Sequence, residues 1–242
     1  HLAMRYKNPS IPSVLEEMRK KNYDDIVVVT MFPQYASAST GSALQEVMET
    51  VRNWWVIPEM RFVSQYYDHP KYIDAFVARG RQYNLDAYDH IIFSYHGLPE
   101  RQVDKVHEKG TCADYDCESR LTAENKYCYR ATSFATTRLI AERLQIPKER
   151  YTVSFQSRLN DKWLKPFSDQ VVAECGKKGM KNILVFSPAF TADCLETIIE
   201  IGEEYQEIFK ANGGEKVQLV ESLNDHPLWI QCLKELVLQN DR

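Results

Sequence analysis

The stretch His90-Ile-Ile-Phe-Ser-Tyr-His-Gly-Leu-Pro99 decides the fold class of this 242-residue chain. It opens with a continuous apolar run, which is typical of a strand buried on both faces of a parallel sheet. A glycine and a proline then impose a sharp turn directly after the strand. Similar runs predict strands at residues 26–32 and 181–187, and weaker patterns predict strands at 60–64, 151–155 and 216–220.

Helical patterns lie between the predicted strands. They cover residues 12–22, 42–54, 71–81, 131–144, 167–178, 194–211 and 227–239. Strands that alternate with helices predict parallel sheets with right-handed crossovers. Because the rhythm of strand, polar loop and helix occurs in both halves, we expect two similar α/β lobes. We place the first lobe at residues 1–88 and the second at 89–224, and we expect residues 225–242 to pack back toward the first lobe as a helix.

The composition excludes several classes of function. Lys and Arg number 30 and Asp and Glu number 34, so the net charge is −4 and no basic block is available for nucleic acid. The 9 glycines show neither the G-x-G nor the G-K-[ST] spacing, so we expect no nucleotide cofactor. The longest apolar runs are strand-sized, short of the roughly 18 residues that span a bilayer. With 6 cysteines, too few for a disulfide scaffold, the chain fits a reduced, cytoplasmic compartment.

Ligands of parallel α/β sheets bind beyond the carboxyl ends of the strands, so the loops after these ends are the candidate site. His96 follows the strand quoted above and suits a base or a metal contact, although a solvated or semi-buried histidine is the plainer interpretation. The loop at 31–42 combines aromatic and hydroxyl residues, which indicates either a helix cap or a face for a flat, anionic ligand. The loop at 155–166 is either a polar turn or a site for a carboxylate-bearing aromatic ligand.

The loop after residue 187 leads into an acidic helix. Asp193 and Glu196 form a capping pattern at its start. Further acidic residues recur at three- and four-residue spacing, which places them on one face: Glu200, Glu203, Glu204 and Glu207. This face is either a solvated acidic stripe or a route for a divalent cation, since carboxylates at this spacing bind such ions.

Taken in order, these motifs resemble the ferrochelatase family, whose members insert ferrous iron into a porphyrin to make haem. The matching stretches are Arg5-Tyr-Lys-Asn-Pro9, Pro33-Gln-Tyr35, Ser39-Thr-Gly-Ser42, Ser94–Pro99, Phe155-Gln-Ser-Arg158, Trp163-Leu-Lys-Pro166 and Phe190–Thr197. The resemblance implies two Rossmann-like lobes, chelatase-like, with the porphyrin cleft between them. Because the family normally has a further segment before the Arg-Tyr motif, we expect the first lobe to be truncated at its start.

The resemblance also assigns roles. It implies that His96 and Glu196 are catalytic and face each other across the macrocycle, and that they contact the metal together with Glu200. It implies a porphyrin-binding set that consists of Arg5, Tyr6, Tyr35, Ser39, Thr40, Trp163 and Phe190. The reaction is that of a lyase: Fe²⁺ enters protoporphyrin IX, or a related porphyrin, and two pyrrole protons leave. Histidine is a suitable base for this step near neutral pH.

Two other functions remain open from the sequence. The first is a chelatase for a tetrapyrrole with more carboxylates, such as coproporphyrin or sirohydrochlorin, which predicts more basic residues in the cleft. The second is a tetrapyrrole carrier without turnover, which the presence of both His96 and Glu196 argues against. The partners are then porphyrin and iron, an aromatic cleft lip would allow contact with a membrane surface, and the oligomeric state is open.

Three cysteines stand apart from these motifs. Cys112, Cys117 and Cys128 form a C-x4-C-x10-C pattern in a polar stretch, with His107 or a distant cysteine as a candidate fourth ligand. Some ferrochelatases hold a [2Fe–2S] cluster on cysteines, so the resemblance implies such a cluster, while thiolate chemistry equally suits zinc. The plainer alternative is three ordinary cysteines in a surface loop, since the spacing matches no standard zinc motif.

Overall fold

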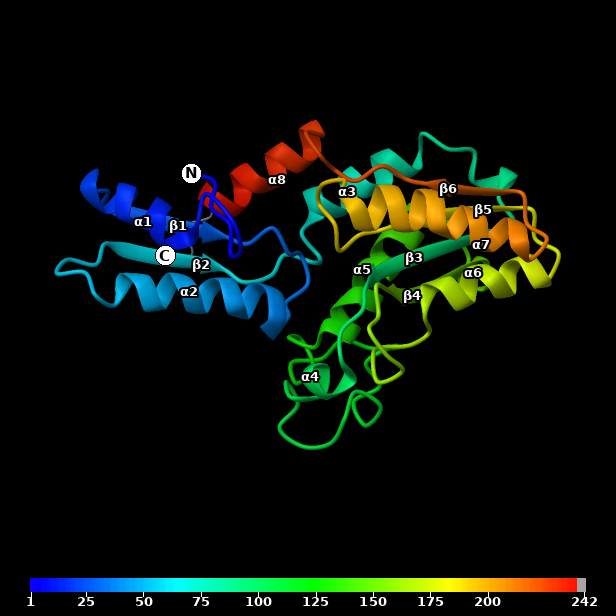
Figure 1. Ribbon diagram of the computed structural model, residues 1–242, viewed down its shortest axis with the longest axis horizontal. Coiled ribbons are helices and arrows are strands. Elements are labelled where there is room, and N and C mark those ends of the chain that lie inside the picture. Colours follow the sequence, from blue (N-terminus) through cyan, green and yellow to red (C-terminus); the bar gives the residue numbers. More distant parts are fainter. Residues whose placement is uncertain (239–242) are drawn as a thin grey trace.

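Two parallel sheets form the framework of the computed structural model, which describes residues 1–238 (Figure 1). Within these residues the first sheet pairs β1 (Asp25–Val29) with β2 (Glu59–Val63). The second sheet has the order β4-β3-β5-β6, and every neighbouring pair is parallel. Its strands are β3 (His90–His96), β4 (Tyr151–Gln156), β5 (Asn182–Phe186) and β6 (Lys216–Leu219). The prediction of parallel sheets flanked by helices is confirmed.

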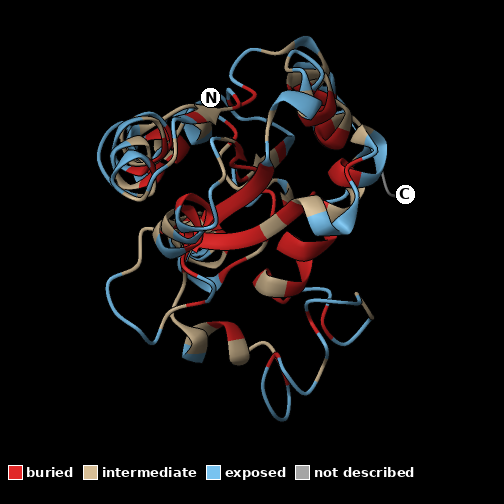
Figure 2. Cartoon of the chain, turned by 90° about the vertical axis from the view of Figure 1, so that its right-hand side faces the viewer, coloured by how far each residue is buried: buried red, intermediate tan, exposed pale blue. Residues whose placement is uncertain are grey.

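The strand β3 lies inside the second sheet, and its residues alternate between two apolar layers. Ile91, Phe93 and Tyr95 face the layer that contains α3 (Pro70–Gly80), α5 (Tyr129–Leu144) and α8 (Pro227–Leu238). Ile92 faces the other layer, which contains α6 (Ser168–Lys177) and α7 (Tyr205–Ala211). Figure 2 shows the strands of this sheet buried between the layers. The period of two therefore places His96 on the same face as Ile92.

The first sheet carries α1 (Ile11–Lys20) and α2 (Ser42–Val51) on one face, where Ile11, Leu15 and Val47 form a separate small core. The helix α8 packs against α3 and also contacts the first sheet. Arg61 of β2 donates hydrogen bonds of 2.8 and 2.7 Å to the carbonyls of Leu236 and Val237 in α8. The lobe boundary at residue 88 stays a prediction, and α3 packs on the second sheet although it precedes that boundary. The part of the predicted terminal helix at 239–242 lies outside the described residues.

The predicted acidic helix at 194–211 differs from a regular α-helix. It begins as a π-helix, η4 (Glu196–Glu204), and continues as α7. The N–H of Tyr205 donates to the carbonyl of Glu200, five residues back, so the turn is wider than an α-turn. A second π-helical turn, η1 (Ser37–Gly41), precedes α2. Hydrophobic spacing does not distinguish these turns from an α-helix, and both lie in loops that belong to the candidate site.

The remaining elements are short. They are η2 (Leu85–Ala87), α4 (Glu100–Asp104) and η3 (Lys148–Arg150). Between α4 and α5 the chain forms a long loop that projects from the second sheet (Figure 1). Among residues 1–238, no helix combines the length and the apolar character needed to cross a membrane.

Candidate active site

A cavity of about 270 Å³ lies where the loop after β1 meets the carboxyl ends of β3 and β5. We call it the central cavity. Its walls come from segments that follow strands of both sheets: Phe32, Ala38 and Ser39 follow β1, His96 and Leu98 lie at and after the end of β3, and Phe190 follows β5. Among the described residues that line it, none is Asp, Glu, Lys or Arg. The central cavity is therefore a largely apolar pocket that contains one imidazole, the side chain of His96.

The side chain of His96 is fixed in one orientation. Its Nδ1 lies 2.7 Å from the carbonyl oxygen of Gly97, so Nδ1 carries the hydrogen and Nε2 is left with a free lone pair in the neutral ring. The phenol of Tyr129 donates a 3.0 Å hydrogen bond to the carbonyl of His96. The rings of Trp163 and Phe190 lie with their centroids 6.5 and 6.3 Å from the imidazole. His96 is thus a half-buried imidazole, positioned by its own turn, that can accept a proton or a metal at Nε2.

Gln156 connects the strand of His96 to the acidic helix. It is paired with His96 in the register of β3 and β4, and it is almost fully buried. Its Oε1 accepts a 2.8 Å hydrogen bond from Ser94, and its Nε2 donates to the carbonyl of Glu196 (2.8 Å) and to the carboxylate of Glu200 (3.1 Å). The start of η4 is therefore held against the carboxyl end of β4 by a buried amide.

The carboxylate of Glu200 is surrounded by donors. Besides Gln156, it accepts hydrogen bonds from the N–H of Ser157 (2.9 Å), the hydroxyl of Ser157 (2.5 Å) and the phenol of Tyr205 (3.2 Å). Ser157 presents both donors because it adopts a left-handed conformation with φ of 59°. Burial, and secondly the charge of Glu200, raises the pKa of Tyr205, so its phenol remains a donor. Each carboxylate oxygen of Glu200 thus accepts two hydrogen bonds.

The structure brings together some of the predicted site residues and not others. Ser39, His96 and Phe190 line the central cavity, and Trp163 flanks His96. Tyr35 lines a small hollow beside it. Glu196 does not line the cavity; it is half-buried at the start of η4.

Three predicted porphyrin-binding residues have other surroundings. Arg5 donates to Ser42 (2.9 Å to the hydroxyl) and pairs with Glu46 at 3.3 Å, so its charge is used within the first lobe. Tyr6 is exposed, with the Arg5 guanidinium over its ring. Thr40 is fully buried, and its hydroxyl has no partner among the described residues.

Sequence reasoning missed two contributions to the site. Tyr129 lines the central cavity and supports His96, yet it lies in a helix far along the chain, where no local pattern marks it. Gln156 and Ser157 belong to a stretch for which a ligand carboxylate was one interpretation, but they bind the chain's own Glu200. The nearby Arg158 pairs with Asp169.

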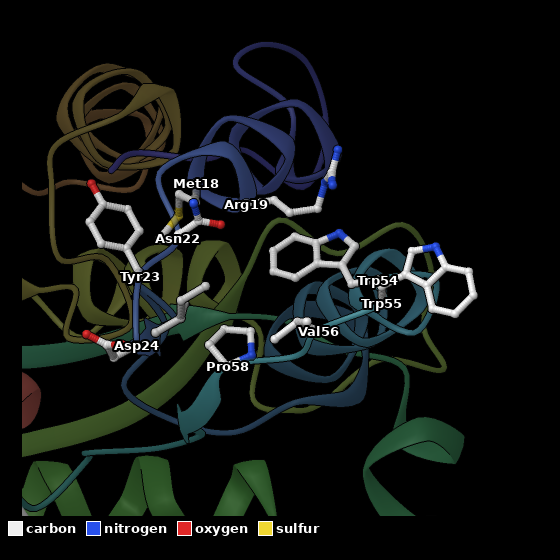
Figure 3. Close-up of a pocket in the computed structure, with 10 residues that line it drawn as sticks. Met18, Arg19, Asn22, Tyr23, Asp24, Trp54, Trp55, Val56 and Pro58 are labelled. Atoms are coloured by element: carbon white, nitrogen blue, oxygen red, sulfur yellow. The ribbon is translucent and has the colours of Figure 1, made fainter.

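A larger cavity of about 450 Å³ lies elsewhere, beside the first sheet (Figure 3). Its walls include Tyr23, Trp54 and Trp55, and none of the predicted site residues lines it. The indole of Trp55 is fully exposed at its rim. Size therefore does not identify the active site, whereas the position of the smaller cavity at the strand ends does.

The loop between α4 and α5 gathers His107, Cys112, Cys117 and Cys128, which we call the cysteine–histidine cluster. All are buried, and their ligand atoms lie within 4.8 Å of one another. His107 Nε2 is 3.5 Å from the sulfur of Cys112 and 3.7 Å from that of Cys117. Hydrogen bonds from Cys112 and Cys128 lower the pKa of the Cys117 thiol. The cluster can offer thiolate and imidazole ligands to a soft or borderline metal.

The fold is that of the chelatases. SirB from Bacillus subtilis, solved with Fe³⁺, aligns with a TM-score of 0.63 over 98% of this chain and 82% of that chain, at 13% identity. SirB from Bacillus subtilis subspecies spizizenii, a sirohydrochlorin chelatase solved with cobalt, aligns with a TM-score of 0.58 over 96% of this chain and 77% of that chain, at 14% identity. At these identities the likeness shows the fold alone.

A family model described as Ferrochelatase matches residues 1–241. A ferrochelatase of Pseudomonas putida strain KT2440 is 38% identical over 97% of this chain and 71% of its own length. One of Legionella pneumophila strain Lens is 40% identical over 98% of this chain and 70% of its own length. The chain belongs to the ferrochelatase family.

Proposed function

We propose that this chain inserts Fe²⁺ into a porphyrin, with protoporphyrin IX as the substrate, and releases two protons as a lyase. The observation that carries the proposal is the central cavity, an apolar pocket between the two sheets that contains one imidazole with a free Nε2. A flat apolar macrocycle suits such a pocket, and its inner nitrogens need a base when metal enters.

The proton balance assigns roles to three residues. Fe²⁺ replaces the two pyrrole hydrogens, so two N–H bonds break and two protons leave while iron–nitrogen bonds form. His96 Nε2 takes the first proton, because Nδ1 is committed to the carbonyl of Gly97. Glu196, at the start of η4, takes the second. Glu200 acts as a positioning residue rather than an iron ligand, because its oxygens already accept four hydrogen bonds.

The lining of the central cavity favours a porphyrin with few carboxylates. Arg5 and Arg158, two cations of the matching motifs, pair with Glu46 and Asp169 rather than facing the cavity. A coproporphyrin or sirohydrochlorin chelatase needs cationic groups in the pocket, and none of the described lining residues supplies one. Turnover of protoporphyrin and coproporphyrin by the same preparation tests this choice, and we expect faster metallation of protoporphyrin.

The test of the catalytic assignment uses two histidines of one strand. We expect His96→Ala to retain porphyrin binding, followed by fluorescence, but to reduce the rate of Fe²⁺ insertion by about 10²–10⁴-fold, the usual contribution of a general base. His90→Gln at the opposite end of β3, where the imidazole contacts Thr152 at 2.9 Å, is the matched control and leaves the rate unchanged. A His96→Ala protein that metallates at the wild-type rate would contradict the assignment. Porphyrin binding without turnover in the wild type would favour a carrier.

We further propose that the cysteine–histidine cluster holds a resident metal. Four buried soft or borderline ligands within 4.8 Å of one another support this proposal. None of these four residues lines the central cavity, so we distinguish this metal from the iron that is inserted. Cytoplasmic location and contact with a membrane surface stay predictions from the sequence.

A further inference from the structure

The loop between α4 and α5 has little to hold it except the cysteine–histidine cluster. Residues 105–127 contain neither helix nor strand. In this range only His107, Cys112, Cys117 and Asn125 are buried, and most other residues are exposed (Figure 2). A loop of this length without secondary structure needs a source of order other than an apolar core. A metal bound by its buried residues supplies that order, since binding free energy becomes folding free energy.

Three of the six distances between the ligand atoms match the edges of a single tetrahedral site. Zinc binds sulfur at about 2.3 Å and imidazole nitrogen at about 2.0–2.1 Å, so the edges of its tetrahedron measure roughly 3.5–3.8 Å. In the cluster, the sulfurs of Cys112 and Cys128 are 3.4 Å apart, and Nε2 of His107 is 3.5 and 3.7 Å from the sulfurs of Cys112 and Cys117. Nε2 is thus the ring nitrogen of His107 that is directed at the sulfurs. The other ring nitrogen, Nδ1, has no partner among the described residues.

The same spacing does not fit a [2Fe–2S] cluster. Each iron of such a cluster takes two protein ligands, and the two irons with their bridging sulfides separate one ligand pair from the other by roughly 5.5 Å or more. In this chain every pair of ligand atoms lies within 4.8 Å. The two-iron cluster that the family resemblance implies would therefore require the ligands to move apart. One ligand is also an imidazole, and three thiolates with one imidazole are a ligand set found in structural zinc sites.

Groups around the ligands hold them in this arrangement. Asn125 donates to the sulfur of Cys117 at 3.5 Å. The ring of Tyr115 stacks on His107 with centroids 4.3 Å apart. Asp104 accepts the N–H of Cys112 at 2.9 Å. Cys128 is the N-cap of the 16-residue helix α5, so the start of this helix fixes the position of its backbone. Such outer contacts orient metal ligands.

We propose that His107, Cys112, Cys117 and Cys128 bind one zinc ion in a closed tetrahedral site, and not a two-iron cluster. The inference rests on the proposal that these residues hold a resident metal. The ion joins the loop to the start of α5, and Tyr129, the next residue after Cys128, supports the backbone of His96. The zinc is thus a structural ion that stabilises one wall of the central cavity.

Metal analysis of the full chain tests this proposal directly. After dialysis against buffer without metal, we expect one zinc per chain, no acid-labile sulfide and no visible absorbance. After replacement of zinc by Co²⁺, we expect the visible bands of tetrahedral thiolate-bound cobalt. The His96→Ala variant should keep its zinc, which separates the resident ion from a metal bound as substrate. Iron with sulfide would overturn the zinc inference and leave a resident metal, whereas a chain without any metal would overturn both.

Ligand variants test the fourth position. We expect His107→Ala and Cys112→Ser to weaken zinc binding by at least about a hundredfold in competition with a chromogenic chelator. His107→Cys should retain zinc, because a set of four cysteines also closes a tetrahedral site. Cys175→Ala is the matched control, since this buried cysteine lies in the core between α6 and the second sheet. Unchanged zinc affinity in His107→Ala would overturn the role of His107.

Discussion

The central cavity and the cysteine–histidine cluster are two candidate sites that are ordered by different means. The cavity gathers residues from distant parts of the chain: Ser39 lies on η1, His96 ends β3 and Phe190 follows β5. The cluster takes all of its ligands from one loop and the first residue before α5. One site therefore depends on packing across the whole molecule, whereas the other depends on a local set of ligands.

The two sites should respond differently to the replacement of one of their residues. Apolar layers cover both faces of the second sheet. Replacement of a polar residue at the cavity should therefore reduce catalytic activity and leave the folded sheet in place. The loop of the cluster contributes few buried side chains, so loss of one ligand removes most of what orders it. Substitutions at the cavity should therefore reduce enzymatic activity, whereas loss of a ligand in the cluster should unfold the loop locally.

The largest expected difference between the two sites is local unfolding of the loop between α4 and α5 when the metal is removed. A strong chelator should speed tryptic cleavage of the loop at the exposed Lys109, Arg120 and Lys126 by at least about tenfold, because the closed state loses its metal-binding free energy. Far-ultraviolet circular dichroism should change little, since the sheets do not depend on the metal. Mass spectrometry of the fragments locates the cuts. Cleavage that is equally fast with and without chelator would mean that packing, not metal, orders the loop.

A smaller effect is expected from the acidic helix. Glu200→Gln keeps the shape of the side chain but loses the charge that four hydrogen bonds stabilise, so we expect kcat to fall by about tenfold with little change in KM. Tyr205→Phe removes one of the four donors and should lower kcat only a few-fold. Steady-state metallation kinetics measure both. A Glu200→Gln enzyme with wild-type kcat would show that Glu200 does not position the site.

The smallest expected effect concerns His90, at the other end of the strand that carries His96. Burial, and secondly the charges of Lys178 and Arg150, lowers the pKa of His90 below 6.5. The folded state therefore binds fewer protons than the unfolded state, and the stabilisation is fully present above about pH 6.5 and decreases as pH falls toward the folded pKa. We expect His90→Gln to reduce the loss of stability between about pH 7 and about pH 5. Urea midpoints at the two pH values check this, and equal losses in the two proteins would contradict it.

Much of the fold could be predicted because strands buried on both faces have a clear signature. Each predicted strand corresponds to a strand of the structure, since uninterrupted β-branched runs such as Ile26–Val29 leave few alternatives. The glycine and the proline after β3 predicted a sharp turn, and therefore predicted that His96 lies at the end of a strand. The wide turns of η4 could not be predicted, because apolar spacing is similar for α- and π-helical turns.

The hydrogen-bond partners of the acidic residues could not be predicted from the sequence either. Spacing alone predicted a continuous acidic face from Glu196 onward, yet Glu200 turns to Ser157 and Gln156, while Glu203, Glu204 and Glu207 are exposed. These partners come from another strand, so no local pattern could associate them. The sequence leaves the fourth member of the cluster open between His107 and a distant cysteine, because sequence distance does not measure spatial distance in an irregular loop.

The sequence by itself determined the parallel α/β class, the strand that ends in His96 and the membership of the ferrochelatase family, because these depend on local periodicity and on ordered motifs. Only the tertiary structure decided which side chains meet: Gln156 with Glu200, Tyr129 with the backbone of His96, and His107 with three sulfurs. The physical reason is that hydrogen bonds and metal ligation act over a few ångströms. Which groups approach so closely is set by packing of the whole chain.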